Sequence, residues 1–399
     1  MSELNKIFFG PAGTGKTRQA IEEAIHIVTD CSNVERQFDK KKTDYENTIE
    51  NFKLFRQLPK LPENINTKII EKMNSNAQSQ DIVNQLARND IRKLAGNEND
   101  IEKAKKIIDE YRTFPLIEMV TFHPSYSYQD FVEGISVETN DKNEIQYKVK
   151  DGIFKKICSR ALDYPENKYV LIIDEINRGD IASIFGELFT LLEDNKRVGK
   201  GKTESLSINL PYSKDERTGN PKTLTVPSNL YVLATMNTVD KSIALIDVAL
   251  RRRFDFIECM PKYKDELPEL KPINGVDLSE LLETINRRIT ILKNEHYQIG
   301  HSYFLDIKDM NDLREVMIKK IIPLLQEYFY DDWKSICAVL NQSYKNPREN
   351  GLLPDDKPND KPNKELFKPE YDELRRYANE IIFKINKEFS EEDIKKVYK

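Results

Sequence analysis

The chain has 399 residues, of which 39% are hydrophobic and 32% are charged, and its formal net charge is −5. This length and apolar content allow about two to three domains with buried cores, while the acidic balance excludes a general electrostatic attraction to nucleic acid. The sequence contains no run of 18 apolar residues and no signal-peptide pattern, so it predicts a cytoplasmic protein without a membrane span.

Cysteine and histidine usage favours the same compartment and gives no indication of a zinc site. The four cysteines, Cys31, Cys158, Cys259 and Cys337, are scattered and form no CxxC pair, which is typical of reduced thiols in the cytoplasm. The four histidines of the chain show no spacing that would place them together as zinc ligands.

The first predicted elements are a short buried strand at residues 4–9 and a helix at residues 16–28. The loop and helix start between them satisfy the pattern G-x-x-x-x-G-K-[ST] with Gly10, Pro11, Ala12, Gly13, Thr14, Gly15, Lys16 and Thr17. Glycines let backbone N–H groups turn toward phosphate oxygens, and the helix directs its positive dipole end to the same place. Lys16 would add a charge to the terminal phosphates, and the Thr17 hydroxyl would bind Mg²⁺.

Residues 30–113 change in composition and are rich in Lys, Glu, Asn, Asp and Gln. Apolar residues recur at helical spacing within this stretch, so we predict several inserted helices. Two interpretations stay open: a solvated helical bundle, or a surface for a partner or nucleic acid.

Strand character returns at residues 115–122 and again in the apolar run at residues 169–173, which ends in Asp174 and Glu175. A phosphate loop needs a second strand that presents an acid to Mg²⁺, and Asp174 suits that role. Glu175 would orient and polarise the attacking water. Strands that alternate with helices predict a parallel sheet covered by helices.

The next segments read as a helix at 181–192, a hairpin at 205–210 and 223–226, and a strand at 230–235 that leads to Asn237. An amide at that strand end could reach the γ-phosphate or the water. Arg251, Arg252 and Arg253 then follow an apolar helix and could supply an arginine finger to a neighbouring subunit.

Strands stop after about residue 261, and the rest of the chain predicts an all-α subdomain. Helices are expected at 278–292, 310–322, 333–340 and 371–385, with a loop at 345–369. The predicted organisation is an α/β core at residues 1–29 and 114–260, a helical insertion at 30–113, and an α-helical lid with a C-terminal extension at 261–399.

The order of these parts resembles that of the AAA+ P-loop NTPases. The segments IIDEINRGDIASIFGELFTLLEDNKR and ATMNTVDKSIALIDVALRRRF resemble the McrB family in particular, the GTP-hydrolysing motor subunits of McrBC-type modification-dependent restriction systems. The segments FHPSYSYQDF and IGHSYFL resemble the same family.

The resemblance implies a role for each matching residue. Residues 10–17 correspond to Walker A and bind the nucleotide, with Mg²⁺ held by Thr17 and Asp174. The resemblance implies GTP, and ATP stays open because the phosphate loop does not contact the base. The catalytic residues implied are Glu175 of Walker B, Asn237 in the sensor 1 position, and the trans-acting Arg252 and Arg253. Asp240 belongs to the same stretch as Asn237.

The resemblance also implies a homo-hexameric ring on which a McrC-like nuclease docks, with DNA reached through the complex and antiviral defence as the purpose. In that family a DNA-binding domain precedes the motor, whereas here the phosphate loop begins at Gly10. We therefore expect target recognition to reside on a partner, on a third subunit or on residues 30–113.

Several alternatives remain at the level of the sequence. The protein could instead be an ATP-dependent remodeller similar to the MoxR group, or a nucleotide-timed assembly scaffold. The basic segment 196–202 could line a ring pore or be an exposed loop. His123 and His301 are expected to be structural, and Tyr126 and Tyr128 are expected to pack rather than to stack on bases.

Overall fold

The computed structural model describes residues 4–29, 115–139, 143–165, 167–199, 204–215, 217–239, 248–346, 351–353 and 384–399. The predicted helical insertion at 30–113, Asp240 and Lys202 lie outside these residues, as does most of the helix predicted at 371–385.

The chain divides into two compact units. The first comprises the described residues within 1–9, 16–236 and 241–257, and the second comprises those within 10–15, 237–240 and 258–399. The glycine-rich loop thus belongs to the second unit, although the strand before it and the helix after it belong mainly to the first.

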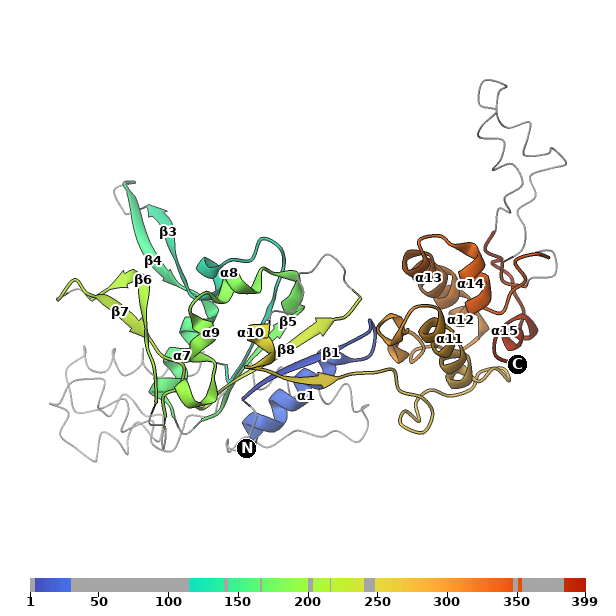
Figure 1. Cartoon of the computed structure of the whole chain (residues 1–399), viewed down its shortest axis with the longest axis horizontal. Helices are drawn as coiled ribbons and strands as arrows, with labels where there is room; N and C mark the ends of the chain where they lie inside the picture. The colour runs from blue at the N-terminus through green and yellow to red at the C-terminus, as the bar shows by residue number, and fades with distance from the viewer. Residues whose placement is uncertain are drawn as a thin grey trace, which may run out of the picture. The chain divides into compact units, whose positions relative to one another are not determined.

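A five-stranded sheet with the order β2-β5-β8-β1-β9 forms the centre of the first unit (Figure 1). Its strands are β1 (Asn5–Gly10), β2 (Ile117–Thr121), β5 (Tyr169–Asp174), β8 (Leu230–Asn237) and β9 (Asp255–Glu258). β5 pairs in parallel with both β2 and β8. The parallel sheet predicted from the sequence is therefore confirmed.

β5 is buried over residues 169–173 because helices cover it. α1 (Lys16–Thr29) and α7 (Ile153–Asp163) both pack against this strand. A parallel strand covered in this way needs apolar side chains on both faces, which explains the continuous run YVLII. α1 contributes a fully buried stripe at four-residue spacing, formed by Ala20, Ala24 and Val28.

Two antiparallel hairpins stand apart from the central sheet (Figure 1). β3 (Glu133–Thr139) pairs with β4 (Ile145–Asp151), a hairpin that we did not predict. β6 (Ile208–Lys214) pairs with β7 (Pro221–Leu224). The hairpin predicted at 205–210 and 223–226 therefore exists, but its first strand lies later in the sequence and its second strand lies earlier.

A buried carboxylate joins the two hairpins to α7. Glu133 is fully buried and accepts hydrogen bonds from Lys155 Nζ at 2.6 Å and from the backbone N–H groups of Tyr212 at 2.8 Å and Ser213 at 3.0 Å. Burial raises the pKa of Glu133, but the bonds from Lys155 and Ser213 outweigh it, so the pKa lies below its usual value. The hairpins therefore share one charged anchor.

Short helices fill the rest of the first unit: α6 (Tyr128–Phe131), α8 (Ile181–Phe185), α9 (Leu188–Leu191) and α10 (Val248–Arg251). The prediction of a single helix at 181–192 is wrong, because the helix is interrupted at Gly186, between α8 and α9. Gly186 has φ of 49°, a left-handed value that glycine adopts without a steric penalty.

The second unit is helical around one apolar core. Its helices are α11 (Leu278–Leu292), α12 (Met310–Val316), α13 (Ile322–Phe329), α14 (Trp333–Val339) and α15 (Glu391–Tyr398). The helix predicted at 278–292 is confirmed. The helix predicted at 310–322 ends too early, because a π-helical turn at Met317–Ile321 carries it into α13.

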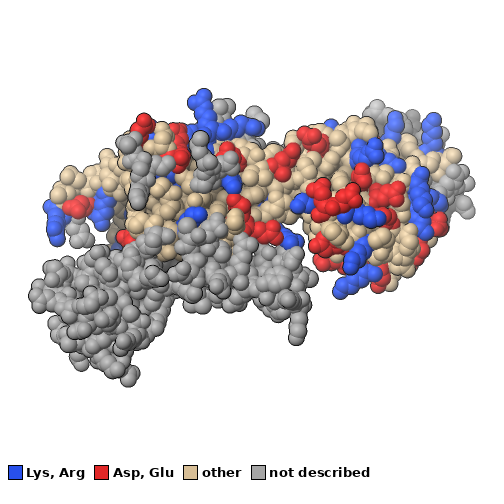
Figure 2. Space-filling model, turned by 90° about the horizontal axis from the view of Figure 1, so that it is seen from below, with Lys and Arg blue, Asp and Glu red and all other residues tan. Residues whose placement is uncertain are grey.

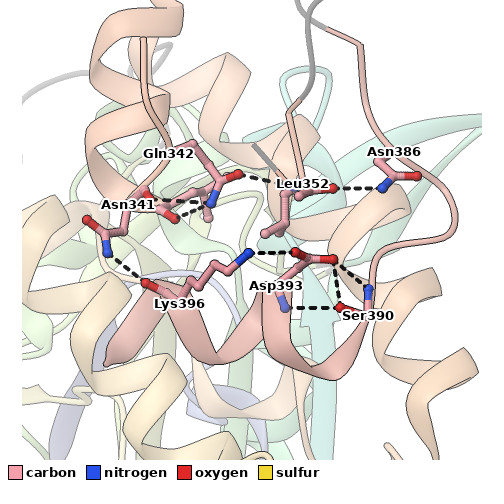
Figure 3. Close-up of polar contacts among 9 residues, drawn as sticks. Asn341, Gln342, Leu352, Asn386, Ser390, Asp393 and Lys396 are labelled. Atoms are coloured by element: carbon pink, nitrogen blue, oxygen red, sulfur yellow. Dashed lines mark hydrogen bonds and ion pairs between the residues drawn. The ribbon is translucent and has the colours of Figure 1, made fainter. Parts of the chain in front are cut away.

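α15, which we did not predict, packs against α11, and Figure 3 shows the polar contacts around it. Its buried side chains are Ile394 and Val397. Asn341 Nδ2 donates to the carbonyl of Lys396 at 2.6 Å, and Ser390 forms a capping box with Asp393 at the helix start. The C-terminal helix is thus an integral part of the second unit.

The visible surface of the second unit carries acidic and basic side chains interspersed, without a large field of one sign (Figure 2). Among the described residues, no helix combines the length and the apolarity that crossing a bilayer requires.

Candidate functional site

Two hydroxyl groups converge on one carboxylate where β5 and β8 end. Thr17 Oγ1 donates a hydrogen bond to Asp174 Oδ1 at 3.0 Å, and Thr235 Oγ1 donates to the same oxygen at 2.5 Å. Parallel strands end at one edge of a sheet, so residues far apart in sequence meet there. The structure brings the predicted pair Thr17 and Asp174 together and adds Thr235, which we did not predict. Lys16, beside Thr17, is 9% exposed.

Glu175 has a left-handed backbone with φ of 53° and ψ of 47°. A residue with a Cβ rarely adopts this conformation, and such strain concentrates at functional sites. The backbone N–H of Glu175 donates to Thr235 Oγ1 at 3.1 Å, which holds the turn against β8. The Glu175 carboxylate lies 3.4 Å from Arg178 Nε in a partly exposed pair. Glu175 is therefore held by its backbone while its side chain faces an exposed partner.

The donor set at this edge fits Mg²⁺. A hydroxyl and a carboxylate are hard oxygen ligands, and Mg²⁺ is commonly held by one or two carboxylates together with substrate phosphates. Within the described ranges no cluster of three or more His, Cys, Asp or Glu residues could hold a metal ion by itself. Thr17 and Asp174 therefore suit a metal that arrives with a phosphate ligand rather than one held by a protein cage.

The glycine-rich loop packs against the helical part of the second unit. The backbone N–H groups of Gly300 and Ser302 donate to the carbonyls of Ala12 and Gly13, each at 3.0 Å. A Cβ at Gly300 would lie 1.9 Å from the Gly13 carbonyl carbon, and Gly13 itself has φ of 77°. Only glycine fits at either position without a shift of the backbone.

Asn237, the last residue of β8, also belongs to the second unit. The next residue, Thr238, donates its backbone N–H to the carbonyl of Gly10 at 3.1 Å. The signature stretch that begins at Asn237 is therefore tied to the start of the glycine-rich loop.

The three arginines lie near the amino end of β1, which we call the amino edge of the sheet. Asp174 lies at the carboxyl end of β5, on the carboxyl edge. Arg253 Nη2 is 2.6 Å from Glu193 Oε1, and its backbone carbonyl accepts a bond from Asn5 Nδ2 at 2.8 Å. Arg251 lies over the ring of Phe256, whereas Arg252 is exposed. A cavity of about 650 Å³ opens here, lined by Leu4, Asn5, Glu193, Asp194, Asn195, Arg251, Arg252, Arg253, Phe254 and Asp255.

Arg197 is fully buried beneath this cluster. Its guanidinium donates to Asn5 Oδ1 at 2.5 Å, to the Leu192 carbonyl at 3.3 Å and to the carbonyls of Pro227 and Leu230. Burial lowers the pKa of Arg197 to about 10, so it remains charged at neutral pH. The pore-lining interpretation of segment 196–202 is therefore wrong for Arg197.

The remaining predicted side chains have structural surroundings. His301 is buried and its Nδ1 accepts a bond from the Lys262 backbone N–H at 3.1 Å. His123 is exposed and contacts Tyr126 edge-to-face. Tyr126 stacks on the buried Phe122, and Tyr128 donates its hydroxyl to Glu187 at 3.1 Å.

Two family models match this chain. The AAA domain of the dynein-related subfamily matches residues 104–254, and the alpha-helical lid domain of McrB matches residues 277–337. The first match covers most of the central sheet, and the second covers α11 to α14 except for the last residues of α14.

Two curated relatives come from restriction systems. The chain is 38% identical over 233 residues to the Type IV methyl-directed restriction enzyme EcoKMcrB subunit of Escherichia coli, which covers 54% of this chain and 48% of that protein. It is 29% identical over 175 residues to the Type II restriction enzyme BsuMI component YdiS of Bacillus subtilis, covering 38% of this chain and 51% of that protein. The chain thus spans about half the length of each relative.

A solved structure from Cytophaga hutchinsonii is also similar over 82% of this chain and 74% of its own, at 15% identity. Its TM-score is 0.24, which is too low to indicate a shared fold.

Proposed function

Because the chain belongs to the McrB family of AAA proteins, we propose that it is the nucleotide-hydrolysing motor subunit of a restriction system. GTP is the preferred substrate over ATP, and the working form is a homo-hexameric ring. A McrC-like nuclease docks on the ring, and DNA is reached through that complex.

The observation that carries this proposal is the separation of the arginines from Asp174 within one protomer. Arg197 binds the carbonyl of Leu230, the first residue of β8, whereas Asp174 ends β5 at the other edge of the sheet. A six-residue strand spans about 17 Å, which is farther than an arginine side chain extends. Arg253 is anchored beside Arg197 through Asn5, and Arg252 precedes it directly, so both suit the site of a neighbouring subunit rather than their own.

Each residue at the carboxyl edge has its own role in hydrolysis. Lys16 would neutralise the terminal phosphates, and Thr17 and Asp174 would hold Mg²⁺, which would supply further charge neutralisation. Glu175 orients the attacking water and accepts its proton. Asn237 completes the phosphate-side contacts, while Thr235 holds both Asp174 and the Glu175 turn in place.

An exposed apolar surface supports a protein partner. One face of the β3–β4 hairpin carries Ile135, Val137, Ile145, Tyr147 and Val149, which are between 42% and 75% exposed. Ile135 pairs with Val149 and Val137 pairs with Tyr147, so these side chains share a face. Contiguous apolar surface of this kind marks protein interaction sites.

The test is hydrolysis of GTP and of ATP by the full chain with Mg²⁺, measured over a dilution series with and without a McrC-like nuclease. We expect turnover per subunit to rise with protein concentration as rings form, GTP to be the better substrate, and the nuclease to stimulate turnover. Lys16→Ala serves as the inactive control. Turnover per subunit that stays constant down to concentrations where size-exclusion chromatography shows monomers would overturn the proposal.

A further inference from the structure

The side chain of Arg253 is held from two sides. Its Nη2 atom lies 2.6 Å from Glu193 Oε1, and its guanidinium lies over the ring of Phe189 at 5.9 Å. The Arg253 side chain is 14% exposed and that of Glu193 is 35% exposed. A guanidinium carries five N–H donors in a rigid planar fork, so a contact that fixes one side of the group also fixes the direction of the rest.

The backbone of Arg253 is held independently of its side chain. Asn5 Nδ2 donates to the carbonyls of both Arg253 and Leu192, and Asn5 Oδ1 accepts from the buried Arg197. Glu193 follows Leu192 directly, so the residue that bonds the Arg253 side chain is adjacent to one that shares its backbone anchor. Both partners of the ion pair are thus fixed to the same buried network.

Arg252 provides the contrast within the same tract. It is exposed and lines the cavity beside Glu193, and among the described residues no hydrogen bond or ion pair holds its side chain. Two neighbouring arginines therefore differ in their surroundings. The Arg253 side chain is paired with Glu193, whereas that of Arg252 faces solvent.

We propose that Glu193 is a positioning residue for the arginine tract, which fixes the Arg253 guanidinium so that it meets the nucleotide of the adjoining subunit in a ready conformation. This inference rests on the proposed trans action of the arginines. A flexible arginine must lose rotamer freedom when it engages a ligand, and a preorganised one has already lost it. Charge stabilisation of a transition state depends on such preorganisation.

The first experiment measures kcat and KM for GTP and for ATP with the full chain carrying Glu193→Ala, Glu193→Gln or Glu193→Asp. We expect Glu193→Ala and Glu193→Gln to lower kcat on the order of 10- to 100-fold, the scale set by misplacing a catalytic group, with KM changed less than about twofold. Glu193→Asp should restore part of the loss. The matched control is Glu204→Ala, because Glu204 is an exposed carboxylate paired with Lys196 nearby. A wild-type kcat for Glu193→Ala would overturn the inference.

The second experiment separates positioning from simple damage to the fold. Glu193→Ala subunits keep an intact Walker B pair, and Glu175→Gln subunits keep an intact arginine tract. A mixture of these two impaired proteins should turn over faster than either protein alone, as should a mixture of Arg253→Ala with Glu175→Gln, because each mixture creates interfaces with one complete site. Recovery in both mixtures supports the inference.

The remaining outcomes distinguish its failure from that of the proposed function. If the Arg253→Ala mixture recovers and the Glu193→Ala mixture does not, Glu193 acts on its own subunit and the positioning role is wrong while trans action stands. If neither mixture recovers, trans action itself is wrong, and the inference is lost with it.

Discussion

The two edges of the central sheet use polar residues in opposite ways. At the carboxyl edge, two hydroxyls converge on Asp174, and Glu175 keeps a strained left-handed backbone beside them. At the amino edge, Arg197 is fully buried and its guanidinium is bonded to four oxygen atoms. The same strands therefore carry a site with accessible polar groups at one end and a satisfied network at the other.

This difference distinguishes residues that contact the substrate from residues that hold other side chains in place. Backbone strain such as that of Glu175 is costly and concentrates at functional sites, so the carboxyl edge is suited to direct contact with substrate. A fully bonded buried network rigidifies its surroundings instead. Variants at the carboxyl edge should impair the subunit that carries them, whereas variants of the arginines should impair its neighbour.

The largest effect is expected from the arginines themselves. Arg252→Ala and Arg253→Ala should each lower kcat on the order of 10³-fold or more, the scale of a lost arginine finger. Nucleotide binding should change little, since both residues lie at the edge away from Thr17 and Asp174. Steady-state hydrolysis and titration with a fluorescent GTP analogue measure the two quantities. Wild-type turnover by both variants would remove the distinction between the edges.

A somewhat smaller effect is expected at the carboxyl edge from Glu175→Gln. Loss of a general base typically costs about 10²- to 10⁴-fold in rate, and the nucleotide should still bind because Lys16, Thr17 and Asp174 remain. Single-turnover hydrolysis together with a binding titration gives both results. The control is Glu138→Gln, since Glu138 pairs only with the exposed Lys148 on the β3–β4 hairpin. Equal losses in the two variants would contradict a specific role for Glu175.

Much of the fold was predictable where one signal dominated. β5 is a compact apolar run because it is covered on both faces, and α11 shows helical periodicity between Asp277, its cap, and its end at Leu292. The helix predicted at 181–192 failed because its apolar periodicity continues across Gly186, whose left-handed backbone breaks the helix. The β3–β4 hairpin was missed although its apolar residues alternate with polar ones, the pattern that predicts a strand.

The candidate site was predictable only where a residue belongs to a local motif. Asp174 and Glu175 end a buried strand, and Thr17 closes the phosphate pattern, so position alone indicates their chemistry. Thr235 is one polar residue within an apolar strand, a weak signal that becomes meaningful only when its hydroxyl is seen on Asp174. Arg197 stands in a basic run that resembles a solvated loop, and only tertiary packing reveals its burial.

The smallest predicted effect concerns stability and compares the edges directly. Arg197→Met keeps most of the buried side-chain volume but removes the donors to Asn5 Oδ1 and to the Leu192, Pro227 and Leu230 carbonyls. Because an unsatisfied buried polar group costs about 1–3 kcal/mol, and carbonyls can relax in part, we expect a loss of about 2–4 kcal/mol in the free energy of unfolding. Thr235→Val at the other edge should cost less, since Asp174 retains the bond from Thr17. Urea unfolding followed by far-UV circular dichroism measures both variants. An equal or larger loss for Thr235→Val would mean that the carboxyl edge, too, is held together chiefly for stability.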